Sequence, residues 1–131
     1  MVEEKEIKAE VSNALEEIED ILERCVRCGL CKGVCPVFKV LHEEVVSPRG
    51  KAVMLRKGIV DKVVFDCTLC KACENKCPAG IKLCDAFRKA RLVLSESGKE
   101  SKENKEMIKN IREYGNPFGK DAGDKKKLYC C

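Results

Sequence analysis

The stretch CVRCGLCKGVCP, at residues 25–36, holds four cysteines at intervals of two, two and three residues and ends on a proline. The stretch CTLCKACENKCP, at residues 67–78, repeats that spacing and the closing proline. Runs with this spacing hold iron–sulfur clusters through their cysteine thiolates. The sequence therefore predicts two cubane clusters of the [4Fe–4S] type, with eight of the eleven cysteines as their candidate ligands.

The spacing also predicts which cysteines share a cluster. Three thiols from one tight turn wrap one side of a cube, and in two-cluster runs the fourth cysteine binds the cluster of the other motif. Such crossing holds the two clusters close together in one core. The predicted ligands of the first cluster are Cys25, Cys28, Cys31 and Cys77, and those of the second are Cys67, Cys70, Cys73 and Cys35.

One position distinguishes the two motifs. Gly29 is expected to let the first loop approach its cluster without a Cβ, whereas the second motif has Lys71 at that place. We therefore expect the two clusters to differ in environment and in reduction potential, within a range of about −700 to +450 mV. The alternative metal is zinc, as in an interaction or nucleic-acid module, but zinc sites typically use two separated Cys-x2-Cys pairs.

Composition restricts the function further. The formal charge of +4 would be offset by two anionic thiolate-bound clusters, so it does not predict nucleic-acid binding. No run is apolar for long enough to cross a bilayer, and the acidic first residues do not resemble a signal peptide. We therefore expect a cytoplasmic protein, where thiols stay reduced and dense cysteines indicate metal binding.

The segments around the motifs predict helices. Residues 3–23 could form a helix packed on the cluster domain or a docking helix for a partner, with acidic residues on its other face. Its expected apolar stripe has spacings of three and four and consists of Ile7, Val11, Leu15, Ile18 and Leu22. Ser47-Pro48 predicts a helix start and Gly58 its end. Further helices are expected over about 81–94 and 102–114. Since the 31 residues between Cys35 and Cys67 also have a helical pattern, the expected fold is all-α.

Several residues lie outside the motifs. Cys84 is expected to be a small buried hydrophobe, with a supplementary ligand or redox thiol as the alternative. His42, the only histidine, is expected at the surface or at a helix cap rather than at a metal. Basic residues around the motifs could compensate cluster charge or form a docking collar for an acidic donor. They are Arg24, Arg27, Lys32, Lys71 and Lys76.

The stretch from Cys25 to Leu94 resembles the ferredoxin part of the C- and D-type subunits of heterodisulfide reductase. It also resembles the iron–sulfur subunits of glycolate, lactate and anaerobic glycerol-3-phosphate dehydrogenases. The resemblance is carried by the two cysteine motifs, by SPRGK at 47–51, by CPAGI at 77–81 and by NPFG at 116–119. It implies an α-helical ferredoxin domain with two cubane clusters over 24–114, preceded by an amphipathic helix over 1–23.

Longer members of that family continue into cysteine-rich CCG domains. The irregular tail at 115–131 ends in Cys130 and Cys131, which resemble the first strand of such a domain, so the chain could be a split-off subunit or a fragment. The implied function is electron transfer in a cytoplasmic hetero-oligomeric oxidoreductase complex, with a CCG-domain or flavoprotein partner. No catalytic constellation is evident, so the expected role is a non-catalytic one; a freely diffusing ferredoxin is the alternative.

Overall fold

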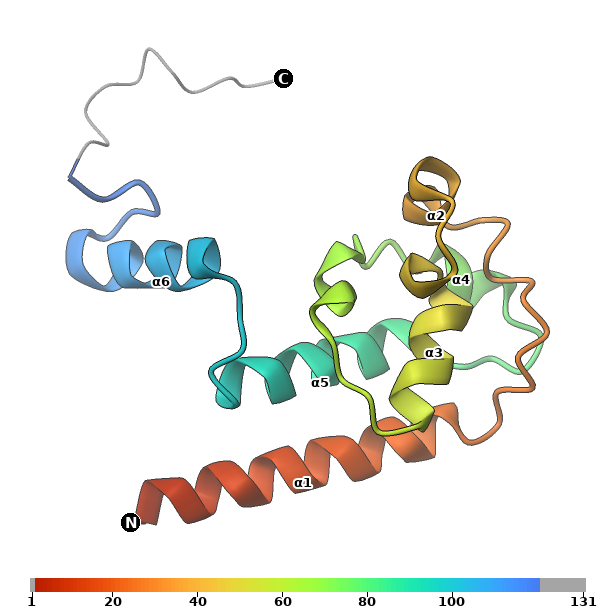
Figure 1. Cartoon of the computed structure of the whole chain (residues 1–131), viewed down its shortest axis with the longest axis horizontal. Coiled ribbons are helices and arrows are strands. Elements are labelled where there is room, and N and C mark those ends of the chain that lie inside the picture. Colours follow the sequence, from red (N-terminus) through yellow and green to blue (C-terminus); the bar gives the residue numbers. More distant parts are fainter. Residues whose placement is uncertain (1, 121–131) are drawn as a thin grey trace. The chain divides into compact units, whose positions relative to one another are not determined.

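The computed structural model describes residues 2–120, and all regular structure in that range is helical (Figure 1). This confirms the expected all-α class. The chain divides into a unit that ends at residue 99 and a second that begins at residue 100. The elements are α1 (Val2–Leu22), α2 (Pro36–Leu41), the 3-10 helix η1 (Glu44–Val46), α3 (Pro48–Arg56), the 3-10 helix η2 (Lys62–Asp66), α4 (Ala72–Lys76), α5 (Leu83–Glu96) and α6 (Lys102–Tyr114).

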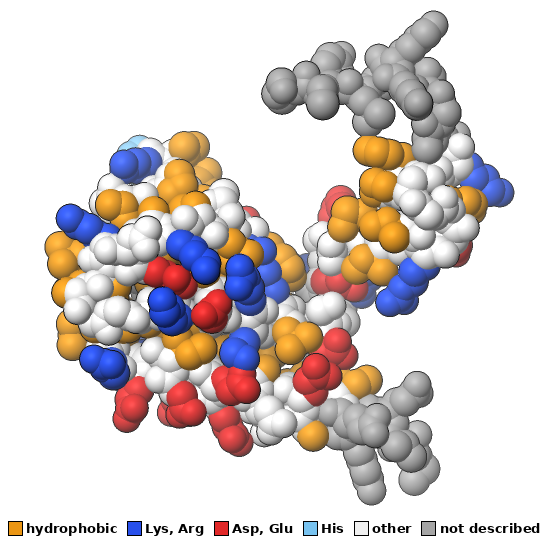
Figure 2. All heavy atoms as spheres, turned by 180° about the vertical axis from the view of Figure 1, so that it is seen from behind, with side chains coloured by type: hydrophobic (Ala, Val, Ile, Leu, Met, Phe, Trp, Pro, Cys, Tyr) orange, Lys and Arg blue, Asp and Glu red, His pale blue; other side chains and the backbone are white. Residues whose placement is uncertain are grey.

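Helix α1 packs along α5, and this is the most extensive pairing of elements in the first unit (Figure 1). Ala14, Ile18 and Leu22 are buried, while acidic side chains follow the outer side of α1 along the lower edge of Figure 2. The structure therefore favours a helix packed on the cluster domain over a docking helix. The expected apolar stripe is partly wrong, because Ile7 and Leu15 are 37% and 38% exposed and Ala14 takes the inner position.

Helix α3 begins where the sequence predicts. Ser47 Oγ accepts a hydrogen bond from the N–H of Gly50 at 2.9 Å, and Pro48 occupies the first helical position. Gly50 is required by space, since a Cβ there would lie 1.9 Å from the carbonyl oxygen of Glu44. The tight contact fixes η1 against the first turn of α3.

Helix α5 contributes more buried residues to the core of the first unit than any other element. Cys84, Phe87 and Ala90 are completely buried along its inner face, together with four neighbours of the same stripe. The helix begins at Leu83, two residues later than expected, because the Glu74 carboxylate of α4 accepts the N–H of Cys84 at 2.8 Å. The interlocking of α4 and α5 places the end of the second motif directly on the core.

The second unit contains α6, with the bounds that the sequence predicts. Ser101 caps its first turn by accepting the N–H of Asn104 at 3.2 Å, and Gly115 ends it at a φ of +71°. The tail expected at 115–131 is described as far as residue 120, so Cys130 and Cys131 lie outside the described residues.

Candidate iron–sulfur centres

The first candidate site is an open cavity of about 430 Å³ beside the loop of the first motif. Four thiols line it: Cys25, Cys28, Cys31 and Cys77. The rest of the lining is largely apolar and includes Ala52, Ile81 and Leu83. Cys77 comes from the second motif, so the two motifs meet at this cavity.

The second candidate site is a cavity of about 330 Å³ on the other side of α3. Its lining thiols are Cys35, Cys67, Cys70, Cys73 and Cys84. Cys35 reaches this cavity from the first motif. The structure thus groups the eight motif thiols in the same two sets of four that the spacing predicts; their roles as ligands stay a prediction.

One motif thiol of each site is hard to ionise in the folded chain alone. Burial raises the pKa of Cys31 to about 11, with further contributions from the neighbouring thiols Cys25, Cys28 and Cys77. Burial raises the pKa of Cys73 to about 12, and the nearby Cys84, Cys67 and Cys31 raise it further. A cationic iron centre would stabilise these thiolates, so its binding should release protons.

The donor set fits an iron–sulfur cluster. Each cavity presents at least four thiols, which is the ligand number and the ligand type of a cubane.

The two motif loops have the same backbone conformation. Arg27 and Gly29 have φ values of +59° and +82°, and the equivalent Leu69 and Lys71 have +56° and +62°. Such alternation turns successive N–H groups toward one side and forms an anion-binding concavity. Gly29 therefore suits a left-handed turn, although Lys71 adopts the same turn with a side chain. A Cβ on Gly29 would lie 3.2 Å from Nη1 of Arg49.

An arginine anchors the first cysteine of each motif. Arg56 of α3 donates through Nη1 to the carbonyl of Cys25 at 2.8 Å. Arg91 of α5 donates to the carbonyl of Cys67 and, at 2.9 Å, to that of Val64. Both bonds run from a helix to a loop that precedes it by more than twenty residues. They hold the start of each loop against the helical core.

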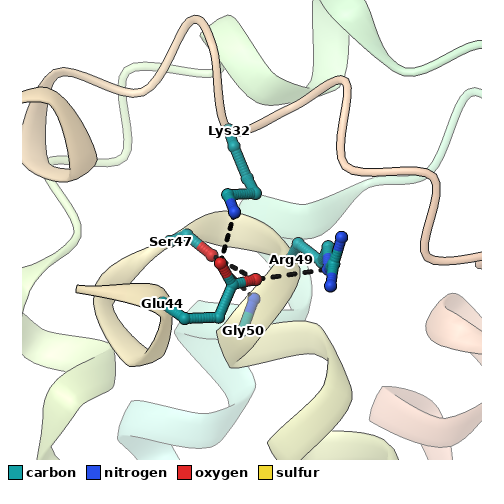
Figure 3. A network of polar contacts seen from close by, with 5 residues as sticks. All are labelled: Lys32, Glu44, Ser47, Arg49 and Gly50. Carbon is teal, nitrogen blue, oxygen red and sulfur yellow. Dashed lines mark hydrogen bonds and ion pairs between the residues drawn. The ribbon is translucent and has the colours of Figure 1, made fainter. Parts of the chain in front are cut away.

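A surface network surrounds the first motif (Figure 3). The Glu44 carboxylate pairs with Lys32 of the cysteine loop and, at 3.2 Å, with Nε of Arg49 of α3. Ser47 Oγ donates to the same carboxylate at 3.4 Å while it caps α3. Together with the space that Gly50 leaves free, these contacts give the SPRG sequence its structural role.

The structure also places the residues outside the motifs that the sequence singled out. Cys84 is fully buried, as expected of a small hydrophobe, but it also lines the second cavity. His42 is exposed and forms the cap at the end of α2, with its ring 6.3 Å from that of Phe38. Of the five basic residues near the motifs, Lys32 is paired with Glu44; the exposed ones are Arg24, Arg27, Lys71 and Lys76.

One residue of the second site was missed by the sequence reasoning. Lys51 is 1% exposed and lines the second cavity with Phe87. The available signal is its register: the Ser47 cap fixes where α3 begins, and Lys51 lies on the same stripe as Ser47 and the buried Leu55.

No helix within residues 2–120 is long and apolar enough to cross a membrane.

Known iron–sulfur proteins are similar in sequence to the part of the chain that carries these sites. Residues 21–81 match the model of the 4Fe-4S dicluster domain. The "Probable glycolate oxidase iron-sulfur subunit" of Bacillus subtilis is 32% identical over 114 residues, which cover 77% of this chain and 25% of that protein. The C-type iron–sulfur subunit of the CoB–CoM heterodisulfide reductase of Methanopyrus kandleri is 34% identical over 91 residues, which cover 63% and 45%.

The "Glycolate oxidase iron-sulfur subunit" of Escherichia coli is 31% identical over 74 residues, which cover 50% of this chain and 18% of that protein. The chain thus spans less than half the length of these three relatives. The expected pair of [4Fe–4S] clusters and the family resemblance are both confirmed. Residues 21–81 are a 4Fe-4S dicluster domain, and the chain is a homologue of the iron–sulfur subunits of glycolate oxidase and heterodisulfide reductase.

Proposed function

We propose that this chain is a non-catalytic electron-transfer component that relays single electrons through two [4Fe–4S] clusters. When bound, each cluster supplies a centre that accepts and releases one electron at a time. The observation that carries the proposal is the pair of thiol-lined cavities on either side of α3, within one core.

The proposed ligands follow the crossed assignment. Cys77 belongs to the first site and Cys35 to the second, and each lies in the cavity of the opposite motif. Burial raises the pKa of Cys73, and the nearby thiol Cys31 raises it further. A thiol of the first motif therefore lies near a thiol of the second. This proximity supports electron exchange between the two centres within the chain.

The surrounding residues have three tasks in this proposal. The left-handed turns at Arg27 and Lys71 direct backbone N–H groups toward the anionic clusters. Arg56 and Arg91 hold the loops in register with α3 and α5. The apolar lining that includes Leu83 and Phe87 limits the access of water, and with it the loss of iron.

The proposed setting is a cytoplasmic hetero-oligomeric oxidoreductase complex. Its support is that the relatives are named as iron–sulfur subunits of glycolate oxidase and of heterodisulfide reductase. The partner would be a CCG-domain or flavoprotein subunit that carries out the chemistry, while this chain would bind neither substrate nor nucleic acid. Because the bound clusters would offset the formal charge of +4, the holo-chain would be close to neutral.

Anaerobic reconstitution tests the relay. The chain should bind about eight irons and eight sulfides, as two cubanes require. One-electron reduction should give the electron paramagnetic resonance (EPR) spectrum of a [4Fe–4S] cluster, and full reduction should add the magnetic coupling of two nearby clusters. A colourless protein with stoichiometric zinc, or a content of about four irons, would contradict the proposal.

A second experiment tests the setting. The chain purified anaerobically from its native host should elute with a CCG-domain or flavin subunit, and the reduced chain should transfer electrons to it in stopped-flow mixing. Elution as a free monomer that reduces several unrelated acceptors at similar rates would favour a freely diffusing ferredoxin instead.

A further inference from the structure

Lys51 is a buried cation at the second cavity, and the relay described so far gives it no role. Its side chain is 1% exposed, and it is the largest of the fully buried side chains in the described residues. Lysine is almost never fully buried unless it is paired. Here Nζ donates to the carbonyl of Val46 and lies 6.0 Å from the centroid of the Phe87 ring. A neutral carbonyl and a ring do not cancel its charge.

The same residue faces the thiols of the second site. Lys51 lines that cavity together with Cys35 and Cys67, and both thiols, as anions, raise its pKa. Desolvation is the larger effect and lowers that pKa. Among the other charged neighbours, Asp66 is exposed and Arg91 is engaged with backbone carbonyls. An anionic cluster in the cavity would be the strongest partner available to the buried ammonium group.

The first cavity has no equivalent among the described residues. The cations that line it are Arg27, which is exposed, and Arg49, whose side chain is 41% exposed and paired with Glu44. Water screens an exposed charge strongly, and a carboxylate cancels much of a paired one. The two sites therefore differ in one unscreened positive charge, although their motif thiols have the same spacing and their loops the same backbone conformation.

We propose that Lys51 raises the reduction potential of the second cluster and thereby biases a single electron within the chain toward that cluster. The inference rests on the proposed electron relay. Reduction adds one negative charge to a cluster, so a fixed cation beside it stabilises the reduced form more than the oxidised form. Burial of Cys73 acts in the opposite direction, because desolvation disfavours added charge. Lys51 offsets that penalty.

The test is an EPR-monitored redox titration of the reconstituted chain and its Lys51 variants. Lys51→Gln removes the charge and keeps a donor for the Val46 carbonyl, Lys51→Met removes both, and Lys51→Arg keeps the charge. Cys28→Ser and Cys70→Ser, which alter the exposed second cysteine of each motif, identify the two cluster signals. Lys62→Met is the control for loss of an exposed charge, since Lys62 is an exposed lysine of η2 that lines neither cavity.

The expected result is a lower potential for the second cluster in both neutral variants, with the first cluster unchanged. The sharing of one electron should shift toward the first cluster at least tenfold, which corresponds to about 59 mV for one electron. Lys51→Arg and Lys62→Met should stay close to the wild type. Unchanged potentials in the Gln and Met variants would overturn the inference while the relay stands.

Two further outcomes are decisive. If both neutral variants load the first cluster but lose the second, Lys51 is needed for assembly rather than for the potential, and the inference is overturned. If the wild-type chain itself holds fewer than about eight irons, the relay fails before Lys51 is tested. Iron analysis of every variant therefore separates a failed inference from a failed proposed function.

Discussion

The two cysteine motifs share one loop conformation but lie in different surroundings. Left-handed residues stand at the same two positions of each loop, and an arginine anchors the first carbonyl of each. The first motif lies beside exposed ion pairs centred on Glu44. The second lies against buried Cys84, Phe87 and Lys51. Spacing thus determines the loop, whereas distant helices determine the environment of each cluster.

Helix α3 is the element that separates these environments. Pro48 lines both cavities; Arg49 lines the first and Lys51 the second. Residues two apart on a helix point in different directions, so one short segment can serve two sites with different chemistry. A change in α3 should therefore affect both clusters, while a change in one loop should affect one.

The largest expected effect comes from exchanging the crossing ligands. In Cys77→Ser the first cluster should be lost or altered, and in Cys35→Ser the second, because each thiol lies in the opposite cavity. Iron content should fall from about eight toward about four in each variant. EPR and Mössbauer spectra compared with those of Cys28→Ser and Cys70→Ser identify the affected cluster. A spectrum of Cys77→Ser that matches Cys70→Ser would contradict the crossing.

A methyl group at Gly50 should damage both sites together. The added Cβ would lie 1.9 Å from the Glu44 carbonyl, so η1 and α3 must separate. Overpacking of this kind costs about 3 kcal/mol in the free energy of unfolding. Anaerobic denaturation followed by visible absorbance should show earlier loss of both clusters in Gly50→Ala.

Gly33→Ala is the matched control for that prediction. A Cβ at Gly33 would come no closer than 4.0 Å to the carbonyl of Leu30, so its stability should stay within about 0.5 kcal/mol of the wild type. Loss of the first cluster alone in Gly50→Ala would show that α3 does not couple the sites.

Many features of the two motifs and of the helices around them could be predicted from the sequence, because they depend on residues that are close together in the chain. The cysteine spacing indicated the grouping of the thiols, the Ser47-Pro48 pair indicated the start of α3, and the helical pattern indicated α5 to within two residues of its start. Helices α2 and α4 were not predicted as helices, since six and five residues are too few for a helical period to stand out.

The burial of Lys51 is harder to predict than these features. The register of α3 gives a local signal for it, but lysine side chains usually lie at the surface, and Phe87, which packs near its ammonium group, comes from α5, more than thirty residues along the chain. The place of Ala14 in the α1 stripe was missed for a related reason: a small residue adds little to an apolar pattern, yet it fits where two helices approach closely.

The arginine anchors give the next prediction. Arg91 is half-buried and serves three carbonyls, those of Val64, Phe65 and Cys67, whereas Arg56 is exposed and serves the carbonyl of Cys25. Arg91→Met should therefore lower the free energy of unfolding by about 2 kcal/mol, the scale of charged hydrogen bonds, and Arg56→Met by less than about 1 kcal/mol.

Cluster-resolved spectra check this difference. Arg91→Met should accelerate loss of the second cluster and Arg56→Met, more weakly, loss of the first. Equal effects of the two substitutions would show that the anchors contribute through charge alone and that burial is unimportant. An effect of Arg91→Met on the first cluster alone would contradict the anchoring of Cys67.

The smallest effect is expected at the exposed network of the first motif. The hydrogen bond from Lys32, and then the charges of Lys32 and Arg49, hold the pKa of Glu44 below its ordinary value. A depressed carboxyl pKa contributes stability above the unfolded-state value, and that contribution is lost as the pH falls through the folded-state value. Since the Glu44 side chain is 45% exposed, Glu44→Gln should cost less than about 1 kcal/mol at neutral pH.

Salt separates this surface network from the buried charge of the second motif. In 1 M salt the screening length falls to about 3 Å, so the difference between Glu44→Gln and the wild type should disappear. The potential shift expected for Lys51→Gln should persist, because ions cannot approach a side chain that is 1% exposed. Anaerobic unfolding and redox titration at low and high salt measure both. A Glu44 effect that survives high salt would show that the first motif, too, depends on a charge shielded from solvent.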